Sequence, residues 1–131
     1  MIRVLLVDDD PACRDALRQL LSMAHDLEIV GEARDGEEAC QIGRRLMPDV
    51  VVIDADLPSA ACLEAMTRLS GAPGRTSQQP SFVCLAVYPD QHDAALQLGA
   101  YGFLRKDGPP RELLAAVREA ARARQARQQP H

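Results

Sequence analysis

The chain has no tryptophan and few other aromatic residues, with two tyrosines and two phenylalanines among 131 residues. A platform of aromatic side chains on which single-stranded nucleic acid could stack is therefore not expected. The formal net charge of −4 at pH 7 also argues against a general nucleic-acid-binding surface. No apolar run approaches the roughly 20 residues of a membrane-spanning helix, and no signal-peptide pattern is present. We expect a cytoplasmic protein that contacts neither membrane nor nucleic acid directly.

The four cysteines lie far apart, and none of them forms a pair with metal-binding or redox spacing; they are Cys13, Cys40, Cys62 and Cys84. We expect reduced thiols, most of them packed in or near the core. A reactive thiol at Cys62 is the less favoured alternative. With 47% apolar and 26% charged residues, the composition is ordinary for one globular domain of this length.

The most informative stretch is the run of β-branched residues from Val50 to Ile53, which ends abruptly in Asp54. Such a run is typical of a strand that is buried on both faces. A buried strand cannot hold an unpaired charge cheaply, so Asp54 is expected at its carboxyl end, where the sheet opens to solvent. Ligands bind at that edge in open parallel sheets. We therefore place Asp54 at the chemical centre of the protein.

The other apolar segments alternate between strand and helix patterns. Strands are predicted at residues 2–7, 27–31, 50–54, 81–87 and 101–104, with a helix after each of them. Pro11 suits a first helical turn with Asp10 as its N-cap, and Pro109 or Pro110 opens the last helix. This order predicts an α/β fold, a flavodoxin-like (βα)5 three-layer sandwich with a five-stranded parallel sheet in the order 2-1-3-4-5.

The last ten residues, RARQARQQPH, show no apolar periodicity. We predict one domain over residues 1–122 and a C-terminal tail, or the start of a linker, over residues 123–131. The arginines of this segment are more simply interpreted as a solvated helix end than as a nucleic-acid contact.

The predicted strand order gathers charged residues at one edge of the sheet. The first, third and fifth strands end in Asp8 and Asp9, in Asp54 and in Lys106. Clustered carboxylates repel one another, and a hard divalent cation or an ammonium group relieves that repulsion. A carboxylate beside Mg²⁺ and lysine can attack a phosphoryl group and form an aspartyl phosphate. Alone, the acidic triplet that ends in Asp10 could be only a helix cap, and Lys106 only a solvated lysine.

Three segments in this order and spacing, VLLVDDDP, VVVIDADLP and GAYGFLRKD, resemble the receiver domain of two-component response regulators. The resemblance runs from about Ile2 to about Arg122. Two further segments, DLEIVGEARDGEEA and KDGPPRELLAAVREAA, resemble the subgroup usually joined to a C-terminal LuxR-type helix-turn-helix DNA-binding domain. Such a domain would lie outside these residues.

The resemblance implies that Asp54 accepts phosphate from a sensor histidine kinase in the presence of Mg²⁺. It further implies that Asp9 and Asp54 ligate the metal directly, Asp8 through water and Asp56 through its backbone carbonyl.

Other roles also follow from the resemblance. It implies that Lys106 pairs with the phosphoryl oxygens, that Phe103 occupies an aromatic switch position, and that the protein forms a homodimer. Phe103 is more safely interpreted as a core aromatic than as a switch. The chain would be a signalling switch in transcription regulation, and its only chemistry would be phosphorylation and dephosphorylation of itself.

The sequence departs from the receiver pattern at two places. The fourth strand of such domains ordinarily ends in Thr or Ser followed by a small residue, but Ala86 and Val87 stand there. Ala61 and Cys62 replace a usual Asp-Gly pair. We expect phosphoryl acceptance to be retained and its coupling to the rest of the fold to be weakened.

Two alternatives remain at this point. A degenerate receiver could act without phosphorylation as a dimerisation or interaction module. A haloacid-dehalogenase-like phosphatase is suggested by Asp54-Ala55-Asp56 after an apolar strand, but that family needs a longer chain and places its motif after its first strand.

Overall fold

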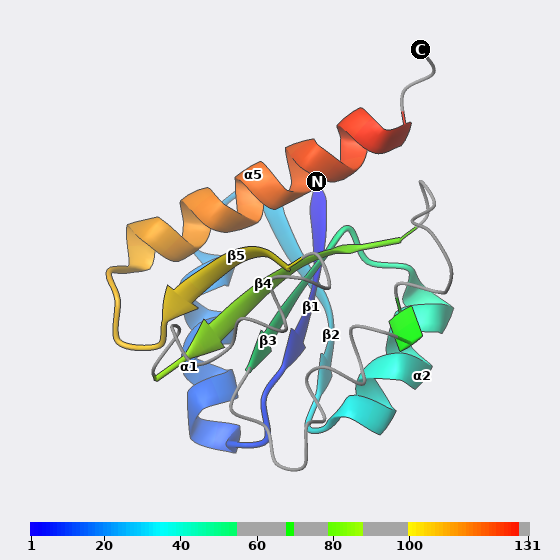
Figure 1. The fold of residues 1–131 in the computed structure, drawn as a ribbon. Helices are drawn as coiled ribbons and strands as arrows, with labels where there is room; N and C mark the ends of the chain where they lie inside the picture. Colours follow the sequence, from blue (N-terminus) through cyan, green and yellow to red (C-terminus); the bar gives the residue numbers. More distant parts are fainter. Residues whose placement is uncertain (55–67, 70–78, 88–99, 129–131) are drawn as a thin grey trace.

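The structure is a computed structural model that describes residues 1–54, 68–69, 79–87 and 100–128 (Figure 1). In these residues the elements are β1 (Ile2–Val7), α1 (Pro11–Ser22), β2 (Leu27–Ala33), α2 (Gly36–Leu46), β3 (Val50–Asp54), β4 (Ser81–Ala86), β5 (Ala100–Arg105) and α5 (Pro110–Gln128). All strand pairs are parallel, and the sheet order is β2-β1-β3-β4-β5. The predicted fold class and strand order are confirmed. Of the helix predicted after β3 only residues 68–69 are described, and they are helical, whereas the helix predicted after β4 falls outside the described residues.

The sheet separates two apolar cores, because successive side chains of a strand point to opposite faces. Leu5 and Val7 of β1 pack in the core on the α2 face. Val4 and Leu6 pack in the core on the other face, which α1 and α5 cover (Figure 1). All five residues of β3 are buried, as the unbroken apolar run predicted. The layers are therefore helix, sheet and helix.

The ends of α1 and α2 are fixed by local backbone chemistry. The Asp10 side chain accepts a hydrogen bond from the Ala12 amide at 3.0 Å and Pro11 opens α1, as predicted. At the end of α2, Met47 adopts the left-handed conformation with φ 49° immediately before Pro48. A capped α1 leaves only a short connection after β1, which keeps the acidic triplet at the sheet edge.

Strand bounds differ slightly from the prediction. β2 continues two residues further, to Ala33, and β5 gains one residue at each end, whereas β4 ends at Ala86 rather than at residue 87. The extra length of β2 comes from pairing with β1, which continues to Val7 opposite Ala33. A partner strand thus extends β2 beyond its apolar run.

The last helix also extends beyond the point where the sequence predicted a tail. Residues 123–128 are helical, and Arg124 is only 7% exposed. Its guanidinium pairs with Asp49 at 2.8 Å, so a polar contact and not an apolar stripe holds this end of the helix. The domain boundary at residue 122 stays a prediction. Among the described residues, no helix has the length and apolar character needed to cross a membrane.

Candidate functional site

The carboxyl ends of β1 and β3 bring three carboxylates together, as the sequence predicted. Asp8 and Asp9 follow β1, and Asp54 is the last residue of the neighbouring β3. Val7 lies opposite Ile53 in the parallel register, so the acids that follow them are at the same level of the sheet. One oxygen from each carboxylate lies within 4.8 Å of the others.

Asp8 is held rigidly inside this cluster. It is 1% exposed, and its Oδ1 accepts a hydrogen bond from the Asp10 amide at 2.9 Å. Its backbone amide donates to the Ala33 carbonyl at 3.0 Å. Its Oδ2 is buried and has no hydrogen-bond partner in the part of the chain that the structure describes. A buried carboxylate oxygen without a donor is costly unless a cation takes that place.

Asp54 has a fixed cationic partner. The Lys106 ammonium lies 2.9 Å from Asp54 Oδ1, with the Asp54 side chain 4% exposed and that of Lys106 25% exposed. The Lys106 amide donates to the Ala86 carbonyl at 3.0 Å, which ties the turn after β5 to the end of β4. The backbone therefore positions this lysine beside the acid.

Among the described residues the cluster carries an excess of negative charge, because one ammonium faces three carboxylates. Carboxylate oxygens at this spacing suit a hard divalent cation, and the unpartnered Oδ2 of Asp8 is an available ligand atom. A cation bound there and the Lys106 ammonium would both lie beside Asp54. Their positive charges could therefore stabilise an anion that approaches Asp54.

The fourth strand brings no hydroxyl to this edge within the described residues. Ala86, the last residue of β4, is fully buried, and the following Val87 is 48% exposed. Asp56, Ala61 and Cys62 lie outside the described residues. Phe103 lies in β5 opposite Cys84, but its side chain is not among those described.

Two neighbours of the cluster were not predicted from the sequence. Arg14 donates through Nη1 to the Asp8 carbonyl at 2.8 Å and pairs through Nε with Glu32 at 3.3 Å. The sequence signal that could have indicated this contact is the position of Arg14, one helical turn after the N-cap Asp10. Burial, together with the nearby Asp8 carboxylate, raises the pKa of the Cys13 thiol to about 11. This cysteine is thus protonated and unreactive at neutral pH.

The other cysteines agree with the prediction where they are described. Cys40 and Cys84 are buried, Cys13 is half-buried, and all three are reduced thiols.

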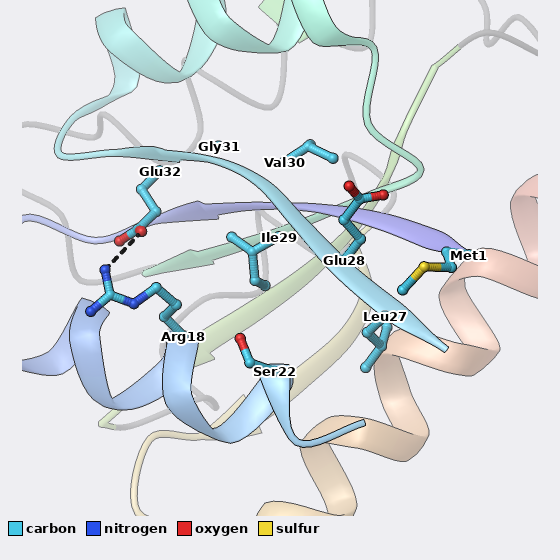
Figure 2. Close-up of a pocket in the computed structure, with 9 residues that line it drawn as sticks. All are labelled: Met1, Arg18, Ser22, Leu27, Glu28, Ile29, Val30, Gly31 and Glu32. Atoms are coloured by element: carbon cyan, nitrogen blue, oxygen red, sulfur yellow. Dashed lines mark hydrogen bonds and ion pairs between the residues drawn. The ribbon is translucent and has the colours of Figure 1, made fainter. Parts of the chain in front are cut away.

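A hollow of about 600 Å³ lies away from the acidic cluster, between α1 and the edge strand β2. Figure 2 shows Arg18 of α1 directed toward Glu32 of β2, and their charged groups lie 3.4 Å apart. Neither Asp54 nor Lys106 lines this hollow. It is therefore a separate feature from the candidate site.

Comparison with known proteins gives consistent matches. Residues 4–118 match the family model described as the response regulator receiver domain. The chain is 37% identical over 120 residues to the nitrate/nitrite response regulator protein NarL of Escherichia coli strain K12, covering 90% of this chain and 54% of that protein. It is 34% identical over 122 residues to the response regulator GacA of Pseudomonas viridiflava, covering 90% and 54%. The chain thus spans about half the length of these curated relatives.

Solved structures agree. The response regulator domain of Thermotoga maritima CheB superposes with a TM-score of 0.80 at 28% identity, covering 93% of this chain and 97% of that one. A two-component response regulator of the LuxR family from Aurantimonas sp. SI85-9A1 superposes with a TM-score of 0.79 at 28% identity, covering 92% and 85%.

Proposed function

The chain belongs to the family of response regulator receiver domains, and on that premise we propose that it accepts a phosphoryl group on Asp54. It is a signalling domain of a two-component system rather than a metabolic enzyme. The observation that carries the proposal is the contact of Lys106 with Asp54 at 2.9 Å beside the carboxylates of Asp8 and Asp9. This set pairs a buried nucleophile with a cation and with oxygen ligands for a metal.

The proposed metal is Mg²⁺, and the donor set fits it. Asp9 and Asp54 would ligate it directly and Asp8 through water, while the backbone carbonyl of Asp56 would add a ligand. Bound Mg²⁺ supplies charge neutralisation for phosphoryl oxygens and for the carboxylates around them. Supporting this choice, the buried Oδ2 of Asp8 has no hydrogen-bond donor among the described residues.

In the proposed step an Asp54 carboxylate oxygen attacks the phosphorus of a phosphohistidine on a sensor histidine kinase. The new O–P bond forms as the P–N bond breaks, and the imidazole keeps the electron pair and takes up a proton. Lys106 would leave the Asp54 carboxylate to pair with the oxygens of the transferred group. Hydrolysis of the acyl phosphate by water would return the carboxylate and release inorganic phosphate.

We also propose that the response to phosphorylation is weak. The side chain of Ala86 cannot donate a hydrogen bond to a phosphoryl oxygen. A missing hydrogen bond to a charged group removes about 1.5–3 kcal/mol. When two states differ by only a few kcal/mol, that loss removes most of the population shift. Val87 and Phe103 are the other proposed switch positions.

The family match and the curated relatives support a proposal for the partners. We propose a sensor histidine kinase as phosphoryl donor, a homodimer as the responding form and a role in transcription regulation in the cytoplasm. We also propose, from the resemblance to the subgroup joined to a LuxR-type domain, that a C-terminal DNA-binding domain outside these residues would supply the contact with DNA.

The experiment that tests the proposal is the mass of the intact protein after incubation with acetyl phosphate and Mg²⁺. The family match gives no support to the phosphatase alternative. A module that works without phosphorylation is favoured by one observation, the absence of a hydroxyl at Ala86. This alternative predicts that incubation with acetyl phosphate and Mg²⁺ does not raise the mass of the protein.

A further inference from the structure

An ion pair with a buried arginine lies at the edge of the sheet opposite to the acidic cluster. Arg124, near the end of α5, places Nη1 2.8 Å from Asp49 Oδ1. Its side chain is 8% exposed and that of Asp49 is 28% exposed. Arg124 Nε also donates to the Gln79 carbonyl at 3.2 Å. The guanidinium thus contacts the segments that lead into β3 and β4.

Asp49 connects several strands at this point. Its Oδ2 accepts a hydrogen bond from the Arg3 amide at 2.8 Å, and its own amide donates to the Arg3 carbonyl at 2.8 Å. Its carbonyl accepts from the Ser81 amide at 3.0 Å. One residue therefore joins the starts of β1, β3 and β4, and Arg124 attaches the end of α5 to that junction.

β3 is flanked by two carboxylates, and their cationic partners lie just before α5 and near its C-terminal end. Asp54 at its carboxyl end pairs with Lys106, which precedes α5, and Asp49 before its first residue pairs with Arg124. Figure 1 shows the second half of α5 running past the N-terminal end of β1. The helix is consequently clamped to one strand at both of its ends.

The two clamps differ in what can release them. The Lys106 ammonium is a quarter exposed, and its partner is the proposed phosphoryl acceptor. The Arg124 guanidinium is almost fully buried, and neither it nor Asp49 belongs to the acidic cluster. Breaking such a buried pair leaves an uncompensated charge, which is strongly unfavourable.

We propose that the Arg124–Asp49 pair is a latch that fixes the C-terminal end of α5 to the start of β3. Movement of α5 is then confined to its Pro110 end, beside Lys106. The movement rests on the proposed function, because it begins when Lys106 exchanges Asp54 for a phosphoryl oxygen. The latch itself does not depend on the proposed function, because the Arg124–Asp49 pair is present without a phosphoryl group.

Hydrogen exchange tests the latch without any ligand. In Arg124→Gln, amides of residues 119–128 exchange at least about tenfold faster than in the parent, as expected when a buried pair is broken. Arg122→Gln is the matched control, since Arg122 is an exposed arginine on the same helix, and its exchange stays at the parent level. Equal rates in the two variants overturn the latch.

Asp49→Asn is a second variant that distinguishes loss of the ion pair from general destabilisation in Arg124→Gln. It reproduces the faster exchange at residues 119–128, and adding Arg124→Gln to it produces little further change, because both substitutions remove the same contact. Fully additive effects overturn the pairing. Amides of Leu5 to Val7 in β1, which lie beyond the contact of Asp49 with Arg3, serve as the internal reference. Exchange that rises equally there contradicts a local latch.

Beryllofluoride with Mg²⁺, a phosphoryl mimic, tests the movable end. In the parent it changes exchange at residues 111–114 and leaves residues 119–128 unchanged, whereas in Arg124→Gln the change spreads to both segments. Equal change at both ends of the parent overturns the proposal. No change at either end overturns the movable end. The intact mass of a separate sample, incubated with acetyl phosphate and Mg²⁺ and without beryllofluoride, shows whether the proposed function has failed as well.

Discussion

The Lys106 ammonium lies 2.9 Å from Asp54 Oδ1 and places a cation beside a cluster of three carboxylates. The two residues come from the turn after β5 and from the end of β3, which are separated by β4 in the sheet. Their contact depends on the strand order and not on sequence proximity. It partly compensates the negative charge that Asp8 and Asp9 add.

Removal of this lysine destabilises the metal-free protein. Lys106→Gln is expected to lower the free energy of unfolding by about 1–3 kcal/mol, less than for a fully buried pair because Lys106 is partly exposed. Arg105→Gln is the control, since its pair with Asp107 is largely exposed and is expected to change stability little. Urea unfolding in the presence of a chelator measures both, and equal losses contradict the role given to Lys106.

Asp8 should oppose folding without metal and favour it with metal. Asp8→Asn removes a buried charge from a repulsive cluster, so it raises metal-free stability by on the order of 1 kcal/mol. In the parent, Mg²⁺ at 100 times its Kd adds about 2.7 kcal/mol, and this increment is lost in the variant. Asp10→Asn keeps the helix cap and retains the increment. Thermal unfolding with and without Mg²⁺ measures this increment in each variant. If Asp8→Asn keeps the full stabilisation by Mg²⁺, the proposed metal site is refuted.

Restoring a hydroxyl at the end of β4 is expected to strengthen the response to a phosphoryl mimic. Ala86→Thr supplies a donor to a phosphoryl oxygen, and Ala86→Val has almost the same shape without the hydroxyl. Because Ala86 is fully buried, overpacking costs both variants about 1–3 kcal/mol. The change in hydrogen exchange caused by beryllofluoride should be larger in the threonine variant only. A response no larger than that of the parent contradicts weak coupling through this position.

The Asp26 carboxylate accepts two hydrogen bonds from Arg118, which hold its pKa below its ordinary value. The stabilisation from a lowered carboxyl pKa is complete above the ordinary value near 3.8 and disappears as the pH falls through the folded-state pKa. In Arg118→Gln the pKa of Asp26 rises toward its ordinary value. A carboxyl NMR titration measures this, with Asp107, which Arg105 holds, as the unchanged control. An unmoved Asp26 would show that Arg118 is not the cause.

The sequence was sufficient to predict the fold and the centre of the candidate site. The apolar run that ends in Asp54 has one stable place in a parallel sheet, and the alternation of strand and helix patterns limited the strand order. Once that order was set, Asp8, Asp9 and Lys106 had to meet Asp54 at one edge. The structure confirms their proximity.

The latch at the opposite edge could not be predicted in the same way. Arg124 lies in a segment without apolar periodicity, and its order comes from a charged contact with Asp49, which is 75 residues away in the chain. Hydrophobic patterns do not report such pairs, because they depend on tertiary geometry. For the same reason Arg14 was missed as a partner of the Asp8 carbonyl.

The most direct test of the account is the intact mass of the protein after incubation with acetyl phosphate and Mg²⁺. We predict a gain of one phosphoryl group, which is absent in Asp54→Asn and abolished by a chelator. Asp56→Asn is the control for modification of a neighbouring carboxylate and should still gain the group. An unchanged mass in folded, Mg²⁺-bound parent protein, or an equal gain in Asp54→Asn, would contradict phosphoryl acceptance at Asp54.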